Sequence, residues 1–329
     1  THCISSAASD VYKRQVVNII TKKASKEWVG NITLDHTFQE DRDYGDASKF
    51  SIYSSGALIE DKLGLALRGN IFRRDASEVK SSEGALLNQR GANPVKSDNY
   101  LLGGKLTWIL NDKNSLWLDG EVANQQYDNK ENQLGTIGAT GGYEGSLHYQ
   151  RRKLTLGSDN QLSFGSWNSS LSYSETDNKG RLITTDSVPS GSPAVGQKRR
   201  LENTNVILDS KLVAPVGESH LVTIGGQYWN ATLKDGVVLA NNGNKFKQDS
   251  WALFSEDEWR LLDSLALTYG ARYEYHETFG GHVSPRAYVV WNALDDLTIK
   301  GGVSTGYKTP SLAHLHNGVS GVTNQGTDT

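Results

Sequence analysis

Alternation of apolar and polar residues is the main signal along the chain, and it begins at Trp28. In the segment 28–39, Trp28, Ile32, Leu34 and Phe38 fall on one face, and the residues at 31, 33, 35, 37 and 39, all of them polar, fall on the other. A strand sorted in this way separates an apolar environment from water. The pattern predicts thirteen strands, at 28–39, 48–59, 63–74, 100–110, 115–127, 147–157, 165–176, 203–213, 220–233, 249–260, 264–276, 283–291 and 297–305.

The connections between these strands alternate in length. The long connections are 40–47, 75–99, 128–146, 177–202, 234–248 and 277–282, and another begins after Thr305. The short connections are 60–62, 111–114, 158–164, 214–219, 261–263 and 292–296. Outer-membrane barrels have short periplasmic turns and long extracellular loops, whereas a soluble sandwich has no reason to keep its long loops on one side. The alternation therefore favours a transmembrane β-barrel.

Tryptophan placement supports the same fold. All eight tryptophans lie at or near the ends of predicted strands, and barrels carry aromatic girdles at the two membrane interfaces. We therefore expect the tryptophans to mark these interfaces, with Tyr127, Tyr149, Tyr173 and Tyr275 adding to the outer one.

Composition narrows the function classes. The mean hydropathy is -0.51, and no stretch reaches the roughly 18 unbroken apolar residues that a membrane helix needs. The net charge of -3 and the absence of a basic stripe argue against a nucleic-acid partner. The chain contains no methionine, and residues 1–15 lack the apolar core of a signal peptide, so we expect an export signal further upstream. Cys3 is the only cysteine, which excludes a disulfide within the chain.

Three motifs resemble TonB-dependent outer-membrane receptors. They are VVNIITKK at 16–23, which resembles the end of the plug domain in that family, ALFSEDEWR at 252–260, and GVSTGYKTPSL at 302–312. Together they are most similar to the catecholate-siderophore branch, which includes the colicin I receptor and the ferric enterobactin receptor. Residues 1–15 show nothing of the glycine-rich stretch that precedes VVNIITKK in the family, and they look like foreign sequence.

The resemblance implies a domain organisation. Residues 1–15 form a non-native leader, residues 16–27 form the end of the plug and a linker, and residues 28–329 form a barrel truncated at its C-terminus. The fold class is then all-β: an antiparallel transmembrane barrel holding about 13 of some 22 strands, with only the last strand of the plug. The expected location is the bacterial outer membrane.

The resemblance also implies a function. The parent protein binds a ferric siderophore, of catecholate type, and imports it with energy from the TonB complex, which contacts a missing N-terminal region. Outer-membrane lipid, lipopolysaccharide and colicin are further expected partners. The reaction is transport and not enzymatic catalysis, and iron enters only with the siderophore, so no cofactor is expected.

Candidate ligand-binding residues follow from the chemistry of this ligand. Ferric catecholates are anionic and aromatic, and arginine can donate in a fork to such oxygens. The two strongest groups lie on strands separated by one neighbour, so that they could face the same funnel; further candidates stand elsewhere. The candidates are Arg151, Arg152 and Lys153; Lys198, Arg199 and Arg200; and Arg73, Arg74, Tyr307 and Lys308.

Simpler interpretations stand beside this one. Any single basic residue near the outer leaflet can bind lipopolysaccharide phosphate or solvate a loop, and Tyr307 and Lys308 match a family motif that we interpret as structural. His314 and His316 lie two apart in a loop and are read as solvent-facing, so no metal site is expected. The alternatives to a siderophore receptor are a passive porin, an adhesin-type barrel without energy coupling, or a soluble carbohydrate-binding β protein.

Overall fold

The computed structural model describes residues 26–85, 87, 94–130, 143–185, 190–199, 201–235 and 245–310. The described part forms thirteen antiparallel strands in a single sheet, ordered along the chain. The strands are β1 Val29–Thr37, β2 Ala47–Ile59, β3 Leu63–Arg74, β4 Ser97–Asn111, β5 Asn114–Asp128, β6 Tyr143–Leu162, β7 Gly165–Arg181, β8 Leu201–Val216, β9 His220–Asp235, β10 Lys245–Leu262, β11 Leu265–His276, β12 Gly280–Leu294 and β13 Leu297–Ser304. The predicted type and number of barrel strands are confirmed; the predicted last strand of the plug lies outside the described residues.

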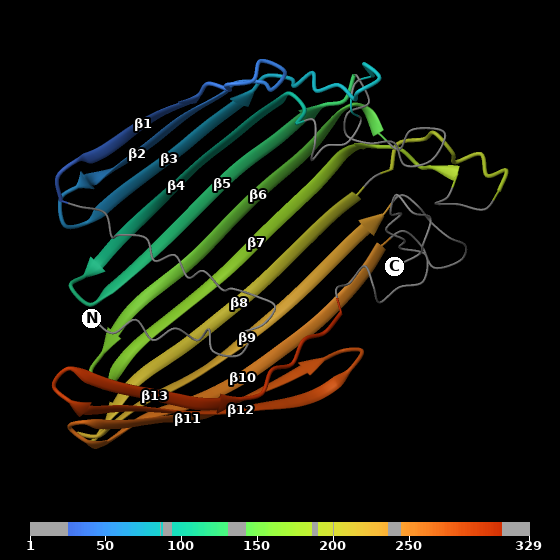
Figure 1. The fold of residues 1–329 in the computed structure, drawn as a ribbon. Helices are drawn as coiled ribbons and strands as arrows, with labels where there is room; N and C mark the ends of the chain where they lie inside the picture. The colour runs from blue at the N-terminus through green and yellow to red at the C-terminus, as the bar shows by residue number, and fades with distance from the viewer. Residues whose placement is uncertain are drawn as a thin grey trace.

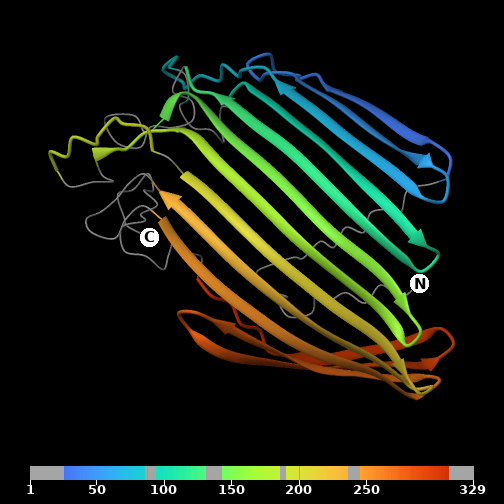
Figure 2. The ribbon, with the colours of Figure 1, turned by 180° about the vertical axis from the view of Figure 1, so that it is seen from behind.

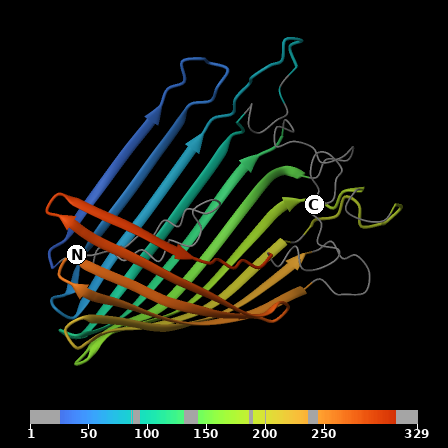
Figure 3. The ribbon, with the colours of Figure 1, turned by 60° about the horizontal axis from the view of Figure 1, so that its bottom comes forward.

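The sheet is strongly curved but does not close. Strands β1 to β10 form a broad curved wall, and β11 to β13 turn back beneath it (Figures 1 and 3). Within the described residues, β1 pairs with β2 and β13 pairs with β12, and these two edge strands do not pair with each other. The structure is therefore an open β-barrel. No helix in the described part is long and apolar enough to cross a membrane.

One face of the sheet carries a continuous apolar row. Leu106, Leu118, Leu156, Leu171 and Leu208 lie directly opposite one another on the successive strands β4 to β8. Each side chain is exposed, although in a water-soluble protein such a row would be buried. We assign this outward face to the lipid, as expected for a barrel wall.

The same row ends in aromatic residues at the outer end of the sheet. Leu208 lies opposite Tyr228, which lies opposite Trp251, which lies opposite Tyr275. Trp251 stacks on Tyr275 with ring centroids 5.7 Å apart. This cluster has the position and chemistry of an interfacial aromatic girdle.

The opposite, inward face is mostly polar. Its corresponding row runs from Lys105 through Asp119 and Thr155 to Ser172. Successive residues of a strand point to opposite faces, so this row lies one residue away from the leucine row along each of β4 to β7. The inward face is the lumen side of the wall.

Two tryptophans do not belong to the girdles. Trp117 and Trp229 share the inward face, because Trp117 lies two residues before Asp119 and Trp229 follows Tyr228, which faces outward. The Trp229 indole Nε1 donates to Asn205 Oδ1 at 3.0 Å. The prediction that all eight tryptophans lie at membrane interfaces is wrong for these two, because position near a strand end does not reveal which face a residue occupies.

The two ends of the sheet differ in the length of their connections. The turns at one end are all short, and the longer connections lie at the other end (Figure 2). The predicted long connection at 277–282 is wrong, since β11 ends at His276 and β12 begins at Gly280. Gly280 adopts φ 72°, which glycine tolerates and which closes a turn of three residues. Several strands also extend past their predicted ends; β6 spans Tyr143–Leu162 against a prediction of 147–157.

Candidate functional site

A network of charged side chains crosses the inward face from β3 to β6. The Arg68 guanidinium donates from Nη1 and Nη2 to the two carboxylate oxygens of Asp119, at 2.9 and 2.8 Å. Its Nε and Nη2 also donate to Glu121 Oε2, at 3.3 and 3.1 Å. Arg151 Nη2 donates to the other oxygen of Glu121 at 2.6 Å. Two arginines and two carboxylates thus join β3, β5 and β6, and the network crosses β4 in the middle of the wall.

Gly103 makes room for this network. β4 lies between Arg68 and its partners, and Gly103 faces inward directly opposite Arg68 on one side and Glu121 on the other. A Cβ atom at Gly103 would lie 2.7 Å from Arg68 Cζ, closer than real carbon atoms approach. The guanidinium therefore reaches its carboxylates by lying over a position that has no side chain.

The first group of predicted ligand residues is divided between the two faces. Arg151 and Lys153 face inward, and Arg152 faces outward, where its Nη1 donates to Glu175 Oε1 at 3.3 Å. Because β6 is longer than predicted, the three residues lie near its middle and not in its outer half. Only Arg151 and Lys153 of this group can meet a molecule in the lumen.

The second group lies at the outer end of β7 and β8. The Arg199 side chain is 7% exposed and binds Asp235 in a fork, with Nε to Oδ1 at 2.9 Å and Nη2 to Oδ2 at 2.6 Å. Lys198 is exposed and lies 3.1 Å from a carboxylate oxygen of Glu144. Arg200 lies outside the described residues. Lys198 is open to a ligand, whereas Arg199 is enclosed by the protein.

One member of each group is connected to the inner side of the wall. Arg151 lies in the same transverse row as Leu233 of β9, through Thr176 and Asn203. Asp235, the partner of Arg199, follows Leu233 by two positions. Three strand spacings of roughly 4.8 Å separate β6 from β9, so these charges lie about 15 Å apart. Arg151 and the carboxylate that holds Arg199 therefore lie on the same face of the sheet.

The remaining candidates are scattered. Arg73 faces outward and lies 3.3 Å from Asp98. Arg74 faces inward, and its Nε is buried with no hydrogen-bond partner among the described residues. Tyr307 stacks on His282 with ring centroids 4.4 Å apart, and the adjacent Lys308 is exposed. Among the described residues, neither this stacking nor any other contact joins Tyr307 to either cationic group.

Sequence reasoning missed Arg68, Asp119, Glu121 and Asp235. Arg68 interrupts the apolar segment LGLALRGN, and a charged residue in such a strand is expensive unless it faces the lumen. This inward position could have been read from the alternation. The pairing of Arg68 with Glu121, 53 residues away, needed the strand register.

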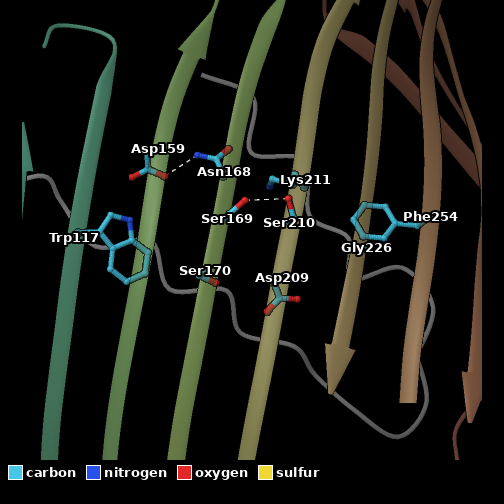
Figure 4. Close-up of a pocket in the computed structure, with 10 residues that line it drawn as sticks. All are labelled: Trp117, Asp159, Asn168, Ser169, Ser170, Asp209, Ser210, Lys211, Gly226 and Phe254. Carbon is cyan, nitrogen blue, oxygen red and sulfur yellow. Dashed lines mark hydrogen bonds between the residues drawn. The ribbon is translucent and has the colours of Figure 1, made fainter. Parts of the chain in front are cut away.

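A shallow cavity of about 250 Å³ lies farther toward the short turns. Trp117 and Phe254 stand at its two sides, and Asn168 Nδ2 donates to Asp159 Oδ1 at 2.6 Å between them (Figure 4). Lys105 Nζ lies 4.4 Å from the centroid of the Trp117 ring. In the described part of the chain, no three His, Cys, Asp or Glu side chains are grouped to hold a metal ion.

Comparisons with known proteins agree with this architecture. The family model described as "TonB dependent receptor-like, beta-barrel" matches residues 74–328. The "Iron-regulated outer membrane virulence protein" of Vibrio cholerae is 32% identical over 308 residues, covering 91% of this chain and 42% of that protein. The "Ferric enterobactin receptor" of Pseudomonas aeruginosa is 24% identical, covering 92% of this chain and 44% of that protein.

Solved structures show the same fold. The ferric enterobactin receptor (PfeA), in a crystal structure with BCV-L6, superposes with a TM-score of 0.77 at 20% identity, covering 92% of this chain and 47% of that one. The siderophore receptor PirA from Acinetobacter baumannii gives 0.71 at 23% identity, covering 90% and 45%. The chain therefore spans somewhat less than half the length of the relatives it matches.

Proposed function

Because this chain belongs to the family of TonB-dependent receptor-like β-barrels of the bacterial outer membrane, we propose that the receptor containing it binds a ferric siderophore and imports it with TonB-supplied energy. The observation that carries the proposal is the family match over residues 74–328. Relatives named for ferric enterobactin support a catecholate ligand. The family is one of receptors; uptake would involve no covalent chemistry and no cofactor, with iron carried as cargo.

The inward and rim cations supply the chemistry that an anionic catecholate complex requires. Arg151 and Lys153 face the lumen, and Lys198 stands exposed at the outer end. Arginine offers paired donors to ligand oxygens and lysine offers a compact charge. We retain these three as ligand-contacting residues and add Arg200 and Lys308 on the sequence argument. Arg199 contributes through its ion pair with Asp235 and not through a ligand contact.

The outward cations suit a different partner. Arg73 and Arg152 point away from the lumen, Arg73 at the outer end of β3 and Arg152 near the middle of β6. We propose that they contact lipopolysaccharide phosphates.

A colicin and the TonB complex remain further proposed partners, the latter through residues upstream of this chain. We also retain the proposal that residues 16–27 end a plug domain and that residues 1–15 are foreign. Sequencing the gene upstream of this region tests both. A missing plug and TonB box would favour a passive porin.

Equilibrium binding tests the proposed ligand. The full-length receptor, purified in detergent, is titrated with ferric enterobactin and with its linear breakdown products, and tryptophan fluorescence quenching is followed. We expect saturable binding at micromolar concentration or below. Absence of this binding, together with binding of vitamin B12 or a sugar, would refute the siderophore assignment.

A further inference from the structure

The connection between β7 and β8 forms a short ribbon at the outer end of the wall. Leu182 bridges Lys198, and Ile183 N donates to Gln197 O at 2.9 Å. Arg199 N donates to Arg181 O at 2.8 Å. The connection extends beyond the strand ends (Figures 1 and 2). Its two arms are therefore paired at the base, and the arm that returns to β8 carries the cations of the second candidate group.

An ion pair ties this returning arm to the inner side of β9. Arg199 is 7% exposed and Asp235, the last residue of β9, is 0% exposed. The two parallel hydrogen bonds, at 2.9 and 2.6 Å, fix the orientation of the guanidinium as well as its position. Removing one member of such a pair leaves a charge without its partner in a place that water does not reach.

The residue before Arg199 ties the same arm in the other direction. Lys198 Nζ lies 3.1 Å from Glu144 Oε1 on β6. Consecutive residues thus link the arm to strands on both sides of the β7–β8 pair. The Lys198 contact is exposed and weak, so the buried pair of Arg199 and Asp235 sets the position of the arm.

We propose that Asp235 is a positioning residue for siderophore capture: through Arg199 it holds the returning arm of the β7–β8 connection in place and so fixes where the arm presents the exposed Lys198 at the outer end of the wall. The inference rests on the proposed function and adds to it a residue that does not touch the ligand. A binding surface that is already ordered loses less conformational entropy when the ligand arrives. Asp235 would therefore raise affinity without a contact of its own.

A neighbouring ion pair provides a matched control. Lys234 binds Glu202 on the same two strands, β8 and β9. Lys234 and Glu202 lie opposite each other on the outward face, one residue away from Asp235. Breaking this pair disturbs the same strand ends but leaves the inner side of the arm intact. A comparison of variants in the two ion pairs therefore distinguishes a loss of arm position from a general loss of stability at the outer end of the wall.

The test compares Asp235→Asn with Lys234→Gln in the full-length receptor. Affinity for ferric enterobactin is measured by fluorescence quenching, and order in the arm is measured by trypsin cleavage after residues 198–200. We expect Asp235→Asn to weaken binding about tenfold or more and to accelerate cleavage, because Arg199 loses its enclosed position. Lys234→Gln should change neither quantity.

Two further variants keep the inference open to refutation if Asp235→Asn folds poorly. Arg199→Lys keeps the charge but loses the fork, and it should weaken binding less than Asp235→Asn. The exchange Arg199→Asp with Asp235→Arg restores an ion pair and should recover most of the affinity.

Unchanged affinity in a folded Asp235→Asn variant, even with faster cleavage, would overturn the positioning role. Equal loss in Lys234→Gln, or no recovery in the exchanged pair, would also overturn it. Failure of the proposed function would be seen separately, because the unmodified receptor would then bind no ferric enterobactin.

Discussion

Gly103→Val tests whether the inward charge network stabilises the barrel. The Arg68 guanidinium lies over Gly103, and a Cβ atom there would approach Arg68 Cζ to 2.7 Å. The guanidinium must move aside to admit a valine. It then gives up its hydrogen bonds to Asp119 and Glu121, while Glu121 keeps Arg151.

The burial of the three side chains sets the magnitude. Arg68 is 32% exposed, Asp119 is 20% exposed and Glu121 is 13% exposed. Breaking a fully buried ion pair costs about 3 to 5 kcal/mol, and an exposed pair contributes about 0 to 1 kcal/mol. Because this network is partly buried and Glu121 retains one partner, we expect Gly103→Val to lower the free energy of unfolding by about 2 kcal/mol.

Urea unfolding of the full-length receptor, followed by the mobility of the unboiled barrel on gels, measures this loss. Gly104→Val is the matched control: Gly104 faces outward, and its added Cβ would meet the flexible Leu67 side chain at 3.3 Å. That variant should lose little stability. In an Arg68→Ala background Gly103→Val should cost almost nothing, since the interaction it disrupts is already gone. An equal cost in both backgrounds would refute the assignment.

Three other predictions follow from the two faces of the sheet. Arg151→Glu with Lys153→Glu should weaken ferric enterobactin binding, and Arg152→Glu should not, because Arg152 faces outward; equal effects in a quenching titration would contradict this. In receptors reduced to one tryptophan and placed in brominated lipid, Trp251 should be quenched more than Trp229, and the reverse order would exchange the two faces. Residues 1–329 expressed alone should aggregate, because in the described part of the chain β1 and β13 are the unpaired edges of the sheet; a monodisperse soluble product in size-exclusion chromatography would argue against the barrel.

Much of the fold could be predicted because every strand of a barrel wall has the same alternation of apolar and polar residues. Each strand has one face in lipid and one toward water, so Ile32 and Leu34 already show the pattern that all thirteen strands repeat. The strand ends could not be predicted as well. Beyond the membrane both faces meet water, and the alternation that marks the strand weakens although the backbone ladder continues. The extension of β6 from 147–157 to Tyr143–Leu162 is an example.

The candidate site was harder to predict, because residues that are adjacent in the sequence need not lie on the same face of the sheet. Arg151, Arg152 and Lys153 are consecutive, and a strand necessarily sends the middle one to the other face. Arg199 was chosen for its charge, but the structure shows that its charge is already used by Asp235. That pairing depends on where the β7–β8 connection folds, and no local pattern in residues 182–199 specifies it.

Charge balance also indicates where ligand attraction can arise. Arg68 and Arg151 are matched by Asp119 and Glu121, so the network in the middle of the wall is neutral as a unit. An anionic ligand gains little from a neutral cluster unless it displaces a carboxylate, which would leave that carboxylate without its partner. Lys153 on the wall lies outside the network, and Lys198 at the rim has only an exposed and weak contact with Glu144, so these two cations are less constrained. The network therefore mainly stabilises the wall. Capture of an anion depends on the residues around the network and on the arm that Asp235 holds.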